Sequence, residues 1–373
     1  MKKAAFGLLS LLLLTGCWDR LPIRELHLVN YAGVDLDEKS GDVLVNFVVS
    51  KLGKSGQGGG EMLSKMTELK GKSVSEAFGQ GVYTDRGPFY GVDTGMFFIS
   101  EKFASNDPVG QLDFLLHTRY TAINSPVIVI EGSLSKFFKD KSVKAHELID
   151  YISNLGTNKI VNNVTMLHFL LSEEEPLEDI VLPMIKQEDS GVVLKGALLF
   201  QQGKSTGAKL NKKQVRMLML LSGTSLGLQR LTTKLTAPIE GRQPHTGQVN
   251  GIDYAFSTKK VNAKISVRSE PSGLPKVSLK VRMIINIIEL GRGVHPIKSD
   301  YVNKMEKELA DHLKEEAVAT IEKLQKANCD ALGIGKQIRA YHPKIWKSMN
   351  WRKDYPRLSI QPVFDVQIIN ANE

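Results

Sequence analysis

The chain has 373 residues, of which 42% are hydrophobic and 24% charged, a composition typical of a globular protein with two or three domains. Its formal net charge is +9, with no basic run longer than a pair such as Lys212-Lys213 or Lys259-Lys260, and this scatter argues against a nucleic-acid-binding protein. Because the sequence has only two cysteines, the fold is expected to depend on packing and not on disulfide bonds.

The N-terminus resembles a bacterial lipoprotein signal. A lysine pair precedes an apolar run at residues 4–14, which is too short to span a bilayer, and Leu14-Thr15-Gly16-Cys17 matches a lipobox. We therefore expect residues 1–16 to be a signal peptide and Cys17 to carry a diacylglyceryl group that holds the protein on a lipid bilayer. The alternative is an ordinary cysteine in a cleaved secretory signal, but the complete set of signal features favours the lipobox.

Residues 17–188 are predicted to form an N-terminal α+β region. Runs rich in β-branched residues alternate there with segments of helical periodicity. The expected strands are residues 42–51, 94–100 and 127–131, and the expected helices are residues 62–69, 74–78, 108–116, 144–155 and 164–171. A glycine-rich loop at residues 53–60 is the candidate point for a division into two subdomains.

Residues 189–373 are predicted to form a second α+β domain, which follows an acidic, proline-containing segment. A hairpin is expected to begin at residue 191, and Asn211 is expected to cap a helix. Strands are expected at residues 254–256, 261–268, 276–290 and 358–369, and helices at residues 299–328 and 334–346. The strands imply an antiparallel sheet on which the amphipathic helix 299–328 packs. The fold class is therefore α+β, a multi-domain protein with mixed or antiparallel sheets flanked by helices.

No pattern of residues indicates catalysis or a bound cofactor. The eight histidines lack HExxH or HxH spacing, which disfavours zinc, and the glycine run at residues 56–60 lacks the Lys-Ser/Thr that completes a phosphate-binding loop. Cys329 is expected to be a buried small residue. The acidic cluster at residues 173–179 is expected to be a solvated loop and not a pair of catalytic carboxylates. We therefore expect no catalytic residue, no metal site and no cofactor.

An aromatic and basic cluster near the C-terminus is a candidate partner or membrane surface. It contains Trp346, Lys347, Trp351 and Arg352. Tryptophan beside lysine and arginine is typical of membrane interfaces and of docking surfaces. The alternative is a helical segment that buries its tryptophans while the basic side chains extend to solvent.

Several motifs, in a fixed order along the chain, resemble one known family. Cys17-Trp18-Asp19-Arg20 follows the lipobox, and Lys195-Gly196-Ala197-Leu198-Leu199-Phe200 occurs near the middle. Asp330-Ala331-Leu332-Gly333-Ile334-Gly335 and Tyr341-His342-Pro343-Lys344-Ile345-Trp346 occur near the end. The sequence is similar in these motifs to the C-subunit lipoproteins of spore germinant receptors, the Ger(x)C-like family.

This resemblance, and not composition or periodicity, implies a function. It implies a non-catalytic subunit on the outer face of the cytoplasmic membrane, the inner spore membrane, that works with integral-membrane A and B subunits in the response to nutrients. Two alternatives stay open. One is a solute-binding lipoprotein that captures a small nutrient for a membrane partner, and the other is an envelope hydrolase.

Overall fold

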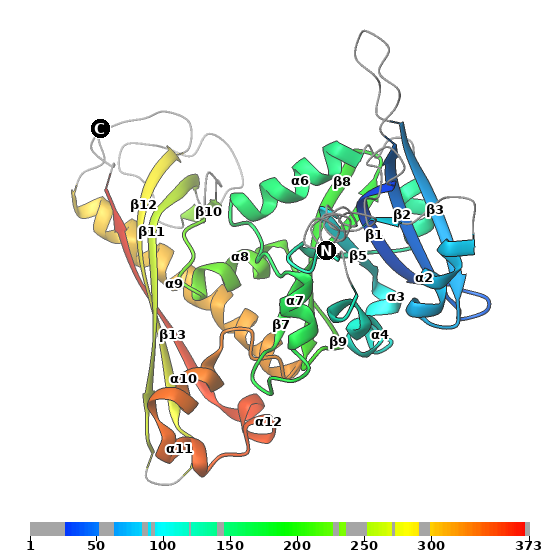
Figure 1. Cartoon of the computed structure of the whole chain (residues 1–373). Helices are drawn as coiled ribbons and strands as arrows, with labels where there is room; N and C mark the ends of the chain where they lie inside the picture. The colour runs from blue at the N-terminus through cyan, green and yellow to red at the C-terminus, as the bar shows by residue number, and fades with distance from the viewer. Residues whose placement is uncertain are drawn as a thin grey trace, which may run out of the picture.

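The computed structural model describes residues 27–51, 63–83, 89–90, 94–118, 121–139, 145–226, 231–235, 252–270, 273–290 and 299–369. Cys17, the signal region and the glycine-rich loop lie outside these residues. The described chain forms two sheets with helices packed against them (Figure 1). This arrangement confirms the predicted class of mixed sheets flanked by helices.

The first sheet has nine strands in the order β3-β2-β1-β5-β6-β7-β8-β9, with β4 paired to β1. The strands are β1 (His27–Leu36), β2 (Val43–Lys51), β3 (Leu63–Gly71), β4 (Phe89–Tyr90), β5 (Met96–Ser100), β6 (Val127–Ile130), β7 (Ile180–Glu188), β8 (Gly191–Gln201) and β9 (Lys204–Asn211). The central strands β1, β5, β6 and β7 are parallel, and antiparallel strands flank them on both sides. The parallel centre is buried on both faces, which explains why β5 and β6 are apolar at nearly every position.

Helices cover both faces of this sheet. They are α2 (Val74–Tyr83), α3 (Glu101–Ala104), α4 (Pro108–Leu112) with the 3₁₀ turn Asp113–Leu116, α5 (Leu134–Lys139), α6 (Ala145–Thr157), α7 (Met166–Leu171) and α8 (Lys212–Leu221). Alternate residues of β5 and β6 point to opposite faces, so Phe97 and Val129 belong to one core while Phe98 and Ile130 belong to the other. The sheet is therefore the middle layer of three.

One predicted helix is a strand. Residues 62–69 were expected to be helical because Met62, Met66 and Leu69 have helical spacing, but the segment is β3, antiparallel to β2. Thr67, Leu69 and Gly71 are buried while Glu68 and Lys70 are exposed. This period of two, together with pairing to β2, overrides the weak helical pattern.

The second sheet has the order β10-β11-β12-β13. Its elements are β10 (Leu231–Leu235), β11 (Ile252–Arg268), β12 (Lys276–Leu290), α9 (Ser299–Lys326), α10 (Ile334–Tyr341), α11 (Pro343–Lys347), α12 (Trp351–Asp354), the 3₁₀ turn Tyr355–Arg357 and β13 (Ser359–Ile368). The long amphipathic helix is confirmed as α9, and its apolar side chains, including Leu309 and Leu313, pack with those of the sheet. In Figure 1 α9 crosses the sheet diagonally.

The predicted antiparallel sheet has one parallel strand at its edge. β11 is antiparallel to β10 and to β12, as expected, but β13 is parallel to β12, with Val281 opposite Phe364, so the second sheet is mixed. Between β12 and β13 the chain passes through α9 to α12 and returns to the end of the sheet at which β12 begins. A parallel partner requires such a crossover connection, and the long helix supplies it.

The two sheets share helices where they meet. The hairpin β8-β9 continues the first sheet past residue 188, so the division predicted at residues 188 and 189 falls inside the β7-β8 hairpin. Asn211 then caps α8 in a capping box with Gln214, as predicted for Asn211. In α8, Val215 and Leu218 pack in one core of the first sheet, while Met217 and Leu221 pack in the core of the second sheet. The two sheets are therefore joined through α8, which contributes side chains to a core of each.

Candidate functional site

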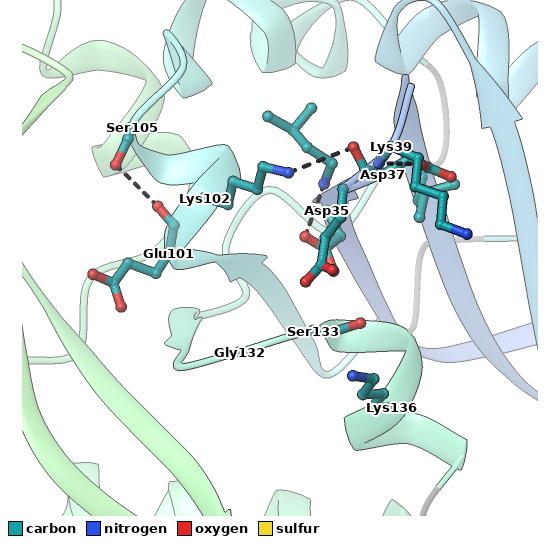
Figure 2. A pocket seen from close by; sticks show the side chains of 12 residues that line it. Asp35, Asp37, Lys39, Glu101, Lys102, Ser105, Gly132, Ser133 and Lys136 are labelled. Carbon is teal, nitrogen blue, oxygen red and sulfur yellow. Dashed lines mark hydrogen bonds between the residues drawn. The ribbon is translucent and has the colours of Figure 1, made fainter. Parts of the chain in front are cut away.

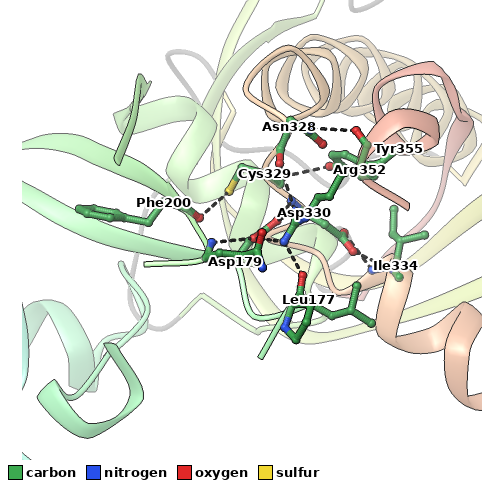
Figure 3. A network of polar contacts seen from close by, with 12 residues as sticks. Leu177, Asp179, Phe200, Asn328, Cys329, Asp330, Ile334, Arg352 and Tyr355 are labelled. Carbon is green, nitrogen blue, oxygen red and sulfur yellow. Dashed lines mark hydrogen bonds and ion pairs between the residues drawn. The ribbon is translucent and has the colours of Figure 1, made fainter. Parts of the chain in front are cut away.

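A buried ion pair joins the loop before β7 to helix α12, at the junction of the two sheets (Figure 3). The Asp179 side chain has no exposed surface, and that of Arg352 is 24% exposed. Arg352 Nη1 donates to Asp179 Oδ2 at 2.7 Å and Nη2 donates to Oδ1 at 2.8 Å. This two-bond geometry is the strong form of an arginine–carboxylate contact, and it connects residues 173 positions apart.

The same two side chains bind backbone groups from three segments. Asp179 Oδ2 accepts a hydrogen bond from the backbone N–H of Asp330 at 2.6 Å, and Oδ1 accepts one from Gln202 at 3.4 Å. The Arg352 guanidinium donates to the carbonyl oxygens of Pro176 and Asn328. Because a buried carboxylate is tolerated only when its lone pairs are satisfied, these contacts fix the positions of all three segments.

Asp330 begins a second polar contact at the start of α10. Its carboxylate accepts hydrogen bonds from the backbone N–H groups of Ile334, at 2.9 Å, and Gly335, at 2.7 Å. The residue is 2% exposed. Burial raises the pKa of Asp330 to about 7, although the two N–H groups oppose this shift. A carboxyl group inside the junction therefore changes its protonation state near neutral pH.

The remaining reactive side chains of the network are fully buried. Cys329 Sγ donates to the carbonyl oxygen of Phe200 at 3.5 Å, and the Tyr355 hydroxyl donates to the carbonyl oxygen of Cys329 at 3.1 Å. Burial raises the pKa of Cys329 and of Tyr355 well above their ordinary values. The Cys329 thiol is therefore protonated at neutral pH and is a structural group, as expected, because the thiolate is the nucleophilic form.

Only the first part of the acidic segment before β7 is the solvated loop that was expected, because Glu173 and Glu174 are exposed whereas Glu178 and Asp179 form ion pairs. Beside the Asp179 contact, Glu178 Oε1 lies 2.8 Å from His168 Nε2, and its Oε2 accepts a hydrogen bond from Lys336 on α10. Burial raises the pKa of Glu178, but the hydrogen bonds from Lys336 and His168 outweigh it and lower that pKa overall. The segment is acidic because it faces basic side chains of α10 and α12, which lie far along the chain.

The structure separates the four residues of the predicted aromatic and basic surface. Trp351 is 6% exposed, and its ring lies so close to α10 that a Cβ added at Gly335 would be 2.6 Å from Trp351 Cε2. Arg352 is engaged in the junction, whereas Trp346 is half-buried and Lys347 exposed. Trp351 and Arg352 therefore stabilise the interior, and of the four predicted residues Trp346 and Lys347 are left for a surface.

A groove of about 760 Å³ lies at the carboxyl ends of β1 and β5 (Figure 2). Its lining carries charges of both signs, including Asp35, Glu101, Lys102 and Lys136. The Asp35 carboxylate is 4% exposed and accepts hydrogen bonds from the N–H groups of Leu36 and Leu134. The carboxyl edge of parallel strands is where open α/β sheets bind ligands, and this groove combines charged side chains with a larger share of apolar surface.

The described residues contain no cluster of three or more His, Cys, Asp or Glu side chains arranged to hold a metal ion. None of their helices combines the length and the apolar character that crossing a bilayer requires.

Two family models together match most of the chain. Residues 19–187 match the spore germination protein N-terminal domain, and residues 195–372 match the C-terminal domain described as spore germination B3/GerAC like. The models meet between residues 187 and 195, although the first sheet continues across this point.

Curated relatives and a solved structure agree with this match. Spore germination protein GerQC of Bacillus cereus is 23% identical over 387 aligned positions, covering 100% of this chain and 99% of that protein. Spore germination protein KC of Bacillus subtilis (strain 168) is 24% identical, covering 96% of this chain and 92% of that protein. The crystal structure of the GerBC protein superposes with a TM-score of 0.60 at 16% identity, covering 91% of this chain and 97% of that one, and confirms the fold.

Removing Arg352 should destabilise the whole chain. In Arg352→Met, Asp179 stays buried without its guanidinium, so we expect the free energy of unfolding to fall by about 3–5 kcal/mol. Arg339→Met, which removes the half-exposed ion pair with Glu175, should cost less than about 1 kcal/mol. Urea denaturation measures both. Combining Arg352→Met with Asp179→Asn should cost less than the sum of the two single changes, and additive effects would show that the pair is not coupled.

The raised pKa of Asp330 predicts a dependence of stability on pH. The folded protein holds a proton on this carboxyl group up to about pH 7, whereas the unfolded chain releases it near 3.8. Since the folded state binds more protons between these values, the contribution of Asp330 to stability falls as pH rises from about 4 to about 7 and is constant above. In Asp330→Asn that part of the slope should disappear. Urea denaturation of both proteins across this range tests it, and parallel curves would contradict the assignment.

Proposed function

This chain belongs to the GerAC-like family of spore germination proteins, and from this membership we propose that it is the membrane-anchored C subunit of a nutrient germinant receptor. The observation that carries the proposal is that both halves of the chain match the two domains of one family, in order and over nearly their whole length. A role in spore germination follows from the family. The anchoring, the partners and the location are our proposals.

We propose that Cys17 carries the anchor. The lipobox at residues 14–17 supports a diacylglyceryl cysteine, and two acyl chains hold a protein on a bilayer far more durably than one. The proposed location is the outer face of the cytoplasmic membrane, which is the inner membrane of the spore. An anchored subunit has a high effective concentration beside integral-membrane A and B subunits, which are the proposed partners.

We propose that the body of the protein couples its partners without catalysis. The reactive groups at the junction of the sheets are engaged in structural contacts, because Asp179 is bound by Arg352 and the Cys329 thiol is buried and protonated. The shared helix α8 and the buried ion pair hold the two sheets as one body. Such a body is suited to transmit a change from one membrane subunit to another.

Loss of the anchor should impair germination while the fold is retained. In spores that carry Cys17→Ala we expect the protein to leave the membrane fraction and nutrient-triggered loss of optical density to slow by about 100-fold, because the effective concentration beside the receptor is lost. Cys329→Ala is the matched control, since it removes the other cysteine and leaves the anchor. Normal germination with Cys17→Ala protein present at normal levels would contradict the proposal.

The groove at the carboxyl ends of β1 and β5 favours a second candidate function, the capture of a small nutrient. Titration calorimetry of the polypeptide from Trp18 to Glu373 with neutral amino acids and hexoses distinguishes a coupling subunit from a nutrient-binding one. A coupling subunit should give no saturable heat. A saturable heat that disappears in Lys136→Gln, and persists in Lys204→Gln on the exposed start of β9, would establish nutrient capture instead.

A further inference from the structure

The outer face of the second sheet is covered by no described element. Along β12 the odd-numbered residues from Val277 to Ile285 are buried against α8 to α12, while the even-numbered residues point the other way. The same alternation holds in β13 and in β11 after Val261. One side of the sheet is therefore core, and the other side is open to solvent in the described structure.

This outer face is strongly basic. Its described cations are Lys260, Lys264, Arg268, Lys276, Lys280 and Arg282, all exposed. β11, β12 and β13 all pair along residues 276–285 of β12. In this stretch the one outward carboxylate is that of Asp365, which lies 3.1 Å from Arg282 Nε and 3.7 Å from Lys280 Nζ. The positive charge of the face is therefore largely uncompensated.

The strand register places like charges side by side. Lys264 is opposite Lys280, and Arg268 is opposite Lys276. Directly opposed like charges destabilise a sheet, so folding alone does not favour this arrangement. Glu270 lies 3.2 Å from Lys276 and Asp365 lies 3.7 Å from Lys280. Lys264 forms no ion pair with a described residue, so an external anion would reduce its repulsion with Lys280.

The excess of positive charge is confined to this face and does not extend to the helix on the other side of the second sheet. Helix α9, on the other side of the sheet, has five lysines and seven acidic residues. Its exposed surface therefore mixes both signs, which is the usual pattern of a solvated surface. The two sides of one sheet thus differ sharply in charge.

We propose that the outer face of β11, β12 and β13 lies against the headgroups of anionic phospholipids. Clusters of lysine and arginine are attracted to anionic bilayers, at about 1 kcal/mol for each residue near the surface. The charged heads remain hydrated there, so lysine, which is depleted in protein interfaces, is suited to this contact. The described outward positions of the three strands carry no aromatic side chain, which disfavours both a protein hot spot and a stacking platform for nucleic acid.

This inference goes beyond the proposed anchor because it uses other residues. A lipid at Cys17 would hold the protein near the bilayer, while the basic face would set which side of the body meets it. The two contacts are separable, since the polypeptide from Trp18 to Glu373 keeps every described residue and carries no lipid.

The experiment is vesicle co-sedimentation of this unlipidated polypeptide. The test variant is Lys260→Gln, Lys264→Gln and Lys280→Gln together, and the matched control is Lys304→Gln, Lys307→Gln and Lys314→Gln on the exposed side of α9. Both variants lose the same net charge. We expect binding to vesicles of phosphatidylcholine mixed with phosphatidylglycerol, roughly 100-fold weaker in the test variant and within a few-fold of normal in the control.

Salt and lipid composition sharpen the result. Binding should be lost on pure phosphatidylcholine and at about 1 M salt, where the Debye length falls to about 3 Å. Equal losses in both variants, or no binding of the unmodified polypeptide to anionic vesicles, would overturn the proposal. Failure of this test would leave the proposed function intact, because Cys17→Ala in spores tests the anchor independently.

Discussion

The structure depends on one buried carboxylate. Asp179 stands before β7 with no exposed surface, in a position where a charge without partners would cost several kcal/mol. Arg352 occupies both of its oxygens, and the N–H of Asp330 adds a third contact. Each partner comes from the second half of the chain, so these contacts join the end of the first half to the segments around α10 and α12. The two family domains are therefore connected by buried polar contacts as well as by the chain itself.

The apolar interior leads to the same conclusion by a different route. α8 contributes Val215 and Leu218 to a core of the first sheet and Met217 and Leu221 to the core of the second sheet. The middle turns of α9 pack in the core of the second sheet, and Leu324 near its end packs in the same core of the first sheet as Val215. A displacement of one sheet must therefore disturb packing that both share. Because close-packed interiors have few intermediate arrangements, the body is suited to act as a rigid link between the proposed membrane partners and less suited to hinge between them.

The parts of the fold that sequence predicts are those in which a local pattern decides the structure. The α9 stripe, the Asn211 cap and the buried runs of β5 and β6 were all predicted because periodicity or capping chemistry fixes them. Residues 63–69 were misassigned as helix because pairing with β2 decided between two weak patterns. The parallel direction of β13 was not predicted because it depends on a crossover of four helices. The ion pair was missed for the same reason. The sequence around Asp179 predicts a solvated loop because its partner, Arg352, is 173 residues away in the chain. Arg352 itself was predicted to belong to a surface.

The second sheet shows how one pattern produces two properties. Alternation along β12 places Val277, Leu279 and Val281 in the core, and the same alternation necessarily places Lys276, Lys280 and Arg282 on the open side. A slip of one residue in register would bury these cations, so the apolar core enforces the orientation of the charged face. The parallel strand β13 strengthens this register, because Val281 is held between Ala263 and Phe364 while Lys280 lies between Lys264 and Val363. The basic face is thus as rigidly specified as the core itself, which is the property that an orienting contact with a bilayer requires.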